Sequence, residues 1–212
     1  MIALISFFCV VSYTWKTVHY TTPFTPSRYD HCAVVLNGQL LVMAGRSYHY
    51  AQFLNDVWRS TDGLSWENLS PSPAFSPRSA VGCAVFESQV VIVGGTVWDG
   101  SPVTWGSKEV WGSATGSSWT SWGPGNFPGR YYHGVATFQG KLWAISGNGD
   151  SGGHLTDVWY TESLTSGKWA NTTLSAAFPG RASFGLTVFG GKMWIAGGTG
   201  DYGTLPGDVW CT

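Results

Sequence analysis

The chain has 212 residues, of which only 11 % are charged, and its formal net charge is −1 at neutral pH. Nucleic-acid binding needs clustered Lys and Arg, which the sequence lacks, and no run of about eighteen apolar residues predicts a membrane span. With 16 % aromatic residues and 29 glycines, the composition favours buried β-strands joined by tight turns over amphipathic helices, which need a charged face.

The chain begins with an apolar run, residues 2–11 (IALISFFCVV). This length suits the apolar core of a signal peptide, although no Lys or Arg precedes it. We therefore interpret residues 1–12 either as a signal peptide or as part of an N-terminal strand.

The dominant feature of the sequence is an internal repeat. Four segments align without a gap, each from an arginine to a glycine seventeen positions later: 28–45, 78–95, 130–147 and 181–198. A phenylalanine precedes each segment, and these phenylalanines are spaced by 51, 52 and 51 residues: Phe24, Phe75, Phe127 and Phe178. A fixed period of this length is typical of propellers and other repeat architectures.

A second repeated block follows within each repeat. It consists of an acidic residue, a valine and a tryptophan, at 56–58, 109–111, 157–159 and 208–210. Another tryptophan follows eight to ten residues later in the first three repeats: Trp66, Trp119 and Trp169. The fourth copy lacks one, but Trp15 stands nine residues before Phe24, just as Trp66 stands nine before Phe75. We therefore expect an N-terminal strand to complete the last unit.

Each repeat predicts four strands. The first two are apolar and are separated by short hairpin turns at 37–38, 87–88, 139–140 and 190–191. The third and fourth strands carry the two tryptophans, and in the first repeat we expect Trp58 to lie opposite Trp66. Opposed indoles on one sheet face would bury a large apolar area between neighbouring sheets.

A repeat of about fifty residues with a diglycine closing its second strand resembles the kelch motif. Gly94-Gly95 and Gly197-Gly198 match the diglycine, while the other two copies keep only its second glycine. The resemblance covers residues 13–212 and implies an all-β, kelch-type β-propeller of four four-stranded blades, with repeats at about 24–74, 75–126, 127–177, and 178–212 plus 13–23. The alternative is a fragment of a larger five- to seven-bladed propeller.

Length-variable loops on one face of this propeller are the candidate binding surface, because binding usually resides in variable loops on a rigid scaffold. The loops join the second and third strands of each blade, and their aromatic, histidine and carboxylate residues are the candidates: Tyr48, His49, Tyr50, Phe53, Trp98, Asp99, Trp105, Asp150, His154, Asp201 and Tyr202. Some of these rings are equally expected to pack the loops down.

These loops predict a non-catalytic module that recognises a protein partner. A carbohydrate-binding extracellular propeller is the alternative, with the loop aromatics as stacking groups. The third hypothesis is an enzyme, since kelch-type propellers also form the central domain of galactose oxidase, and the turn at 60–66 resembles the Asp-box of sialidases. No catalytic residue can be carried over from either family, and we predict no cofactor.

Other repeated residues predict structural roles. One arginine and one tryptophan recur at fixed positions in every blade: Arg28, Arg78, Arg130, Arg181, Trp58, Trp111, Trp159 and Trp210. A ring of arginines holding an anion is the functional alternative, but a single ligand rarely needs four identical contacts. His31 and His133 share one repeat position, which also accepts Val81 and Phe184; we therefore predict no metal site there.

The four cysteines and two glycosylation sequons bear on the compartment. Cys32 lies four residues after its arginine and Cys83 five after its own, which places them on opposite strand faces and predicts no disulfide between them. We expect all four cysteines, Cys9 and Cys211 included, to be small buried residues. Asn68 and Asn171 begin Asn-X-Ser/Thr sequons on the outer blade rim. The sequence thus favours a secreted or extracellular protein, with a cytoplasmic one as the alternative.

Overall fold

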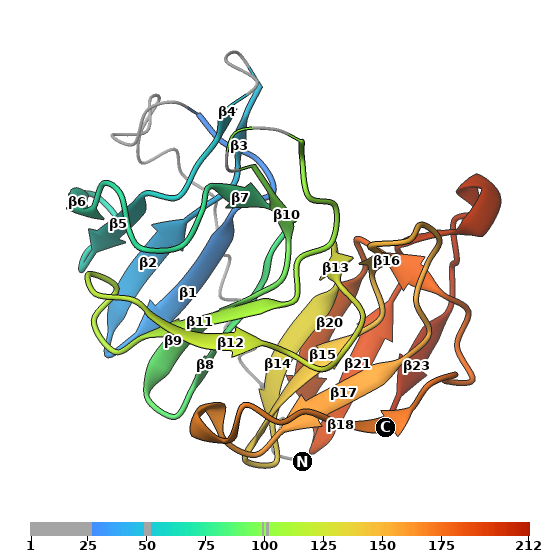
Figure 1. Ribbon diagram of the computed structural model, residues 1–212. Coiled ribbons are helices and arrows are strands. Elements are labelled where there is room, and N and C mark those ends of the chain that lie inside the picture. The colour runs from blue at the N-terminus through green and yellow to red at the C-terminus, as the bar shows by residue number, and fades with distance from the viewer. Residues whose placement is uncertain (1–26, 49–51, 99, 101) are drawn as a thin grey trace, which may run out of the picture.

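The computed structural model describes residues 27–48, 52–98, 100 and 102–212. These residues form an all-β propeller of four blades that succeed one another from the left to the right of Figure 1. The predicted fold class is thereby confirmed. The candidate signal peptide (1–12) and the predicted N-terminal strand (13–23) lie outside the described residues.

The first three blades are four-stranded antiparallel sheets. Blade 1 contains β1 (Cys32–Leu36), β2 (Gln39–Met43), β5 (Val57–Ser60) and β6 (Glu67–Ser70). Blade 2 contains β8 (Gly82–Phe86), β9 (Gln89–Val93), β11 (Glu109–Ser113) and β12 (Thr120–Pro124). Blade 3 contains β14 (Gly134–Phe138), β15 (Lys141–Ile145), β17 (Val158–Thr161) and β18 (Ala170–Thr173).

Blade 4 has three strands within the described part of the chain: β20 (Gly185–Phe189), β21 (Lys192–Ala196) and β23 (Val209–Cys211). Short two-stranded sheets rise above the blades, pairing β3 (Arg46–Ser47) with β4 (Gln52–Phe53), β7 (Arg78–Ser79) with β10 (Thr96–Val97), β13 (Arg130–Tyr131) with β16 (Asn148–Gly149), and β19 (Arg181–Ala182) with β22 (Thr199–Gly200). The helical segments among the described residues are two 3₁₀ turns, η1 (Leu164–Ser166) and η2 (Asp201–Gly203). No helix among the described residues is long and apolar enough to cross a membrane.

The predicted two-residue hairpin turns join the first and second strand of every blade. Both central residues have positive φ in each turn, for example 51° at Asn37 and 75° at Gly38. This geometry matches the right-handed twist of the flanking strands. In blade 2 the same conformation is imposed on two non-glycine residues, Glu87 (48°) and Ser88 (58°).

The core lies between blades rather than inside them. One buried cluster joins Cys32, Leu36 and Val57 of blade 1 to Val90 and Ile92 of blade 2. A second cluster joins the opposite face of blade 2 to blade 3. Blade 2 therefore buries one face against blade 1 and the other against blade 3.

A disulfide joins Cys32 to Cys83, with their Cα atoms 6.3 Å apart, so the prediction of no such bond was wrong. The two cysteines do lie on opposite faces of their own strands, as the sequence indicates. However, they belong to neighbouring blades, whose sheets stack face to face. The forward face of blade 1 meets the backward face of blade 2, so opposite faces bring the two sulfurs together.

Two further expectations are corrected. Trp58 pairs with Asn68 and not with Trp66, because the turn between β5 and β6 sets the register in which Arg59 pairs with Glu67 and Trp58 with Asn68. Cys211 is an exposed free cysteine rather than a buried one.

Candidate interaction face

The repeated arginines anchor the loops that form the candidate binding face, which are the loops between the second and third strands of each blade. Each arginine side chain is almost completely buried and binds the repeated carboxylate of its own blade, in the pairs Arg28–Asp56, Arg78–Glu109, Arg130–Asp157 and Arg181–Asp208. Each guanidinium also donates to the carbonyl oxygen sixteen residues later, at Ala44, Gly94, Ser146 and Gly197. The carboxylate in turn accepts from the indole N–H two residues further on.

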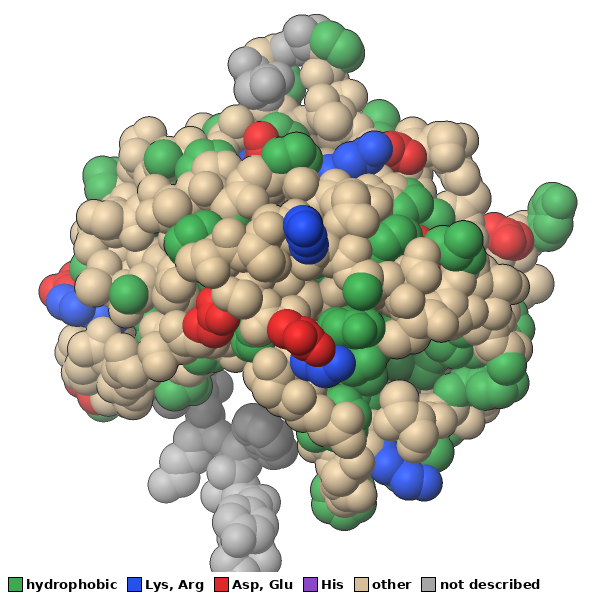
Figure 2. Space-filling view, turned by 60° about the horizontal axis from the view of Figure 1, so that its bottom comes forward, with side chains coloured by type: hydrophobic (Ala, Val, Ile, Leu, Met, Phe, Trp, Pro, Cys, Tyr) green, Lys and Arg blue, Asp and Glu red, His purple; other side chains and the backbone are tan. Residues whose placement is uncertain are grey.

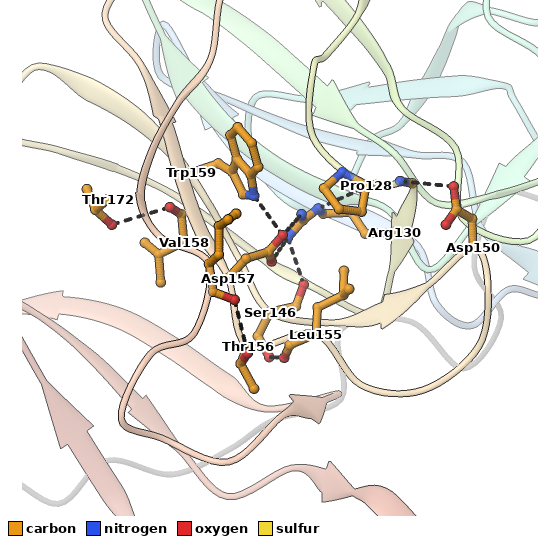
Figure 3. A network of polar contacts seen from close by, with 12 residues as sticks. Pro128, Arg130, Ser146, Asp150, Leu155, Thr156, Asp157, Val158, Trp159 and Thr172 are labelled. Carbon is orange, nitrogen blue, oxygen red and sulfur yellow. Dashed lines mark hydrogen bonds and ion pairs between the residues drawn. The ribbon is translucent and has the colours of Figure 1, made fainter.

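Figure 3 shows this network in blade 3. Arg130 Nη1 and Nη2 lie 2.9 and 2.8 Å from the two oxygens of Asp157, and Trp159 Nε1 donates to the same carboxylate at 2.6 Å. Arg130 also donates to the carbonyls of Ser146 (3.0 Å) and Pro128 (3.2 Å). A bidentate pair with additional hydrogen bonds is the arrangement that makes a buried charge tolerable.

These arginines are therefore occupied by contacts inside the protein, as a structural role requires. An anion above the central axis would have no access to guanidinium groups that are buried to this extent. The face that a partner could contact is formed instead by residues near the arginines in sequence.

A chain of backbone hydrogen bonds runs from blade to blade around the axis. Ala80 N–H donates to Asp30 O, Tyr132 N–H to Ala80 O, and Ser183 N–H to Tyr132 O, all at 3.0 Å. These four residues stand two positions after the repeated arginines, and all have φ of 53–54°. All four residues line one cavity of about 200 Å³, where the blades meet.

Two histidines line this cavity. His133 is buried, and neither of its ring nitrogens has a hydrogen-bond partner among the described residues. Burial lowers the pKa of His133 well below its ordinary value, and the charge of Arg130 lowers it further. Burial and then Arg28 also lower the pKa of His31. Both imidazoles are therefore neutral at pH 7.

An aromatic cluster extends from the cavity toward the loops. Trp105 packs on Tyr131 with ring centroids 5.7 Å apart, and Tyr131 packs on Tyr132 at 5.6 Å. The Tyr132 hydroxyl donates to Asp30 Oδ2 at 2.5 Å, which joins blade 3 to blade 1. Burial and this bond to Asp30 raise the pKa of Tyr132. The cluster thus forms a continuous aromatic surface that ends on a carboxylate.

Trp105 is the most accessible member of the cluster, with 54 % of its surface exposed. A cavity of about 330 Å³ lies beside it, lined also by Lys108, Glu109 and Asp150. Asp150 itself is exposed, and its carboxylate accepts from the Gly129 N–H at 3.3 Å. This part of the face combines an indole with charges of both signs.

The remaining predicted residues differ in their surroundings. Phe53 is buried and packs edge-on against Trp98 at 6.0 Å, with Arg46 5.1 Å from its ring centre, which is the loop-packing alternative expected for some of these rings. It packs the loops of blades 1 and 2 together. Tyr48 and Tyr202 are highly exposed. His49, Tyr50 and Asp99 lie outside the described residues.

His154 and Asp201 connect the loops of blades 3 and 4. The Asp201 carboxylate lies 2.7 Å from His154 Nδ1 and accepts from the His154 backbone N–H at 3.2 Å. These hydrogen bonds from His154 lower the pKa of Asp201. The predicted candidates in these two loops therefore contact each other.

Tyr131, Tyr132 and Asp30 were not among the predicted binding residues. A signal for them exists in the sequence, because they follow the repeated arginines directly, in Arg28-Tyr-Asp and Arg130-Tyr-Tyr. The prediction was confined to the loops between second and third strands, whereas the face also includes the entry into the first strand.

The structure also places the other candidate features. Within residues 27–48, 52–98, 100 and 102–212, no three His, Cys, Asp or Glu residues gather as metal ligands. The sequon residues Asn68 and Asn171 have exposed side chains on the outer strands β6 and β18. Charged side chains are sparse and scattered over the face shown in Figure 2.

Four blades of this topology, each containing the same buried Arg–carboxylate–Trp network, define a kelch-type propeller. The family model for the KLHDC2/KLHL20/DRC7 Kelch-repeats domain matches residues 3–198. The chain therefore belongs to this kelch-repeat family. A search of curated proteins finds no match. The kelch-repeat propeller is a module commonly used in protein interaction, and the family is typically non-catalytic.

Proposed function

We propose that this chain is a non-catalytic binding module that recognises a protein partner through the loop face described above. The observation that carries the proposal is the contiguous cluster of Trp105, Tyr131 and Tyr132 beside the central cavity. Large rings with a polar atom are enriched at the energetically dominant centres of protein interfaces. The rigid scaffold beneath the cluster reduces the entropic cost of ordering it on binding.

A carbohydrate ligand is the second candidate. An exposed indole beside carboxylates can stack on a sugar ring while the carboxylates accept hydrogen bonds from its hydroxyls. Trp105 and Asp150, which line the same cavity of about 330 Å³, provide this combination. The protein ligand is preferred because the aromatic surface continues past this cavity to Tyr132 and the central axis.

Peptide display separates these candidates. A library of random peptides is selected on the immobilised chain and the enriched peptides are measured on two variants, Trp105→Ala and Phe189→Ala. Phe189 is a matched control, since it is an exposed aromatic residue next to a hairpin turn on the opposite side of the propeller. We expect Trp105→Ala to weaken binding at least tenfold and Phe189→Ala to leave it unchanged.

Two outcomes would contradict the protein-binding proposal. Enriched peptides that bind Trp105→Ala as tightly as the unmodified chain would place the site elsewhere. Failure to enrich any peptide, together with binding on a glycan array that Trp105→Ala abolishes, would favour the carbohydrate ligand instead.

We further propose that the protein is secreted or extracellular, with a cytoplasmic location as the alternative. Disulfides persist mainly in oxidising compartments, and the Cys32–Cys83 bond supports this location. The exposed Asn68 and Asn171 sequons are compatible with it. Expression in a eukaryotic secretory host, followed by a glycosidase shift on a gel, tests whether both asparagines carry glycans.

A further inference from the structure

The central cavity of about 200 Å³, where the blades meet, contains one charge that the protein does not balance. Asp30 is the only charged residue among those described that line it, since His31 and His133 are neutral at pH 7. The buried arginines around the axis are each bound by the carboxylate of their own blade, so they add no net charge. A cleft lined by charge of one sign attracts ligands of the opposite sign, so the cavity favours a cation.

The Asp30 carboxylate has an unused oxygen. The Tyr132 hydroxyl donates to Oδ2 at 2.5 Å, but no residue in 27–48, 52–98, 100 or 102–212 bonds to Oδ1. Ala80, Tyr132 and Ser183 occupy the same repeat position in the other blades, and all four residues have φ of 53–54°. The left-handed turn therefore does not require a carboxylate. A carboxamide oxygen would accept from Tyr132 as well, so neither contact accounts for the charge at this position.

His133 adds a second polar group that the fold does not use. It is 7 % exposed, and neither ring nitrogen has a hydrogen-bond partner among the described residues. In blade 4 the same repeat position is Phe184, whose ring lies against Gly134 as the imidazole of His133 lies against Gly82. An apolar ring is thus sufficient for packing between blades. One nitrogen of a neutral imidazole accepts a hydrogen bond, and a buried acceptor without a donor is destabilising.

Aromatic rings connect Asp30 to the loop face. Tyr131 lies at the end of β13 and Tyr132 follows it, above the blades in Figure 1. The faces of such rings attract cations, and the methylene chain of a Lys or Arg packs on apolar surface, which Val81 and Phe184 provide in the cavity. A water molecule takes about 30 Å³ in the liquid, so about 200 Å³ gives room for the end of a side chain.

We propose that the central cavity binds one lysine or arginine side chain of the partner, with its charged group on Asp30 Oδ1. An ammonium or guanidinium group carries only donors, which match the carboxylate and imidazole acceptors. The cavity beside Trp105 is less suitable for a cation, because Lys108 lines it. This inference rests on the proposed protein-binding function and adds the class of partner, a peptide segment that inserts a basic side chain.

Two peptide-display libraries, identical except that one lacks Lys and Arg, test the class of partner on the immobilised chain. We expect the complete library to enrich peptides that share one Lys or Arg, and the depleted library to give binders at least tenfold weaker. Replacing the shared basic residue by Gln should weaken binding of an enriched peptide to the unmodified protein at least tenfold. This comparison needs no protein variant.

Asp30→Asn tests the position of the cation. Asparagine keeps an oxygen for the Tyr132 hydroxyl and tolerates the left-handed conformation, so the substitution removes mainly the charge. We expect it to weaken the basic peptide at least tenfold and to leave the Gln-substituted peptide unchanged. Glu162→Gln is the matched control, since it removes one negative charge from an exposed carboxylate that pairs with Lys141 on blade 3, and it should have no effect.

The outcomes separate this inference from the proposed function. Equal affinities from the two libraries would overturn the basic partner and leave the protein-binding function standing. Basic peptides that bind Asp30→Asn as tightly as the unmodified protein, or that lose equally on Glu162→Gln, would place the cation outside the central cavity and also overturn the inference. Failure of both libraries to enrich any peptide would contradict the proposed function itself, and the inference with it.

Discussion

The cost of removing an arginine should differ between blades, because the carboxylate left behind differs in its access to water. In blade 3, Asp157 is only 6 % exposed, and Arg130→Met would leave it charged, buried and without its bidentate partner. Removing one member of a buried pair costs about 3–5 kcal/mol. In blade 2, Glu109 is 44 % exposed and can be hydrated when Arg78 is lost. Arg78→Met mainly leaves the carbonyls of Ser76 and Gly94 without a donor, which costs about 1–3 kcal/mol.

Equilibrium unfolding in urea, followed by tryptophan fluorescence, measures both losses. The control is Arg130→Met combined with Asp157→Asn, which removes the unpaired charge and should recover part of the stability. If both single variants lose the same free energy of unfolding, or if Arg130→Met loses less than about 1 kcal/mol, the buried network does not hold the loops as we describe.

Three further predictions concern stability. Replacing Cys32 and Cys83 together by alanine should lower the free energy of unfolding by up to about 4 kcal/mol, because the unfolded chain is no longer closed into a loop over a separation of 51 residues. A thermal unfolding midpoint equal to that of the parent protein would contradict the disulfide. Ser88→Gly should raise stability by about 1 kcal/mol, because Ser88 has a φ of 58°, and Gly38→Ser should lower it by a similar amount; the opposite signs in urea unfolding would refute the turn geometry. The backbone N–H groups of Ser65 and Leu64 hold the pKa of Asp62 at about 2. The stabilisation from the Asp62 carboxylate is therefore complete above its ordinary pKa near 4 and is lost as the pH falls through 2. If the loss of unfolding free energy in Asp62→Asn does not shrink over this pH range, these hydrogen bonds do not stabilise the turn as described.

The sequence was sufficient for the repeat, the strands and the hairpins, because these depend on local patterns that recur four times. It was insufficient where two elements meet. The prediction of no Cys32–Cys83 disulfide holds for two cysteines on opposite faces of one sheet. These two cysteines lie in neighbouring blades, whose stacking brings opposite strand faces together. The partner of Trp58 was missed because the turn between β5 and β6 sets their register, and the exact centre of that turn is not evident from the residues at 60–66.

The candidate site was predicted in part for the same reason. Trp105 was recognised from its loop, but Tyr131 and Tyr132 join it only through the packing of neighbouring blades. The paired contacts of Phe53 with Trp98 and of His154 with Asp201 also cross from one blade to the next. Side-chain neighbours across a blade boundary depend on how the sheets are placed around the axis, which a single sequence does not specify.

The most direct test of the interaction face is to locate where a selected peptide binds. Hydrogen exchange with and without a display-selected peptide should show protection at residues 104–107 and 130–133, around Trp105, Tyr131 and Tyr132, and no change at residues 187–191 on the opposite side. Protection confined to residues 187–191, or to the rim of blade 4, would contradict a binding function for the loop face.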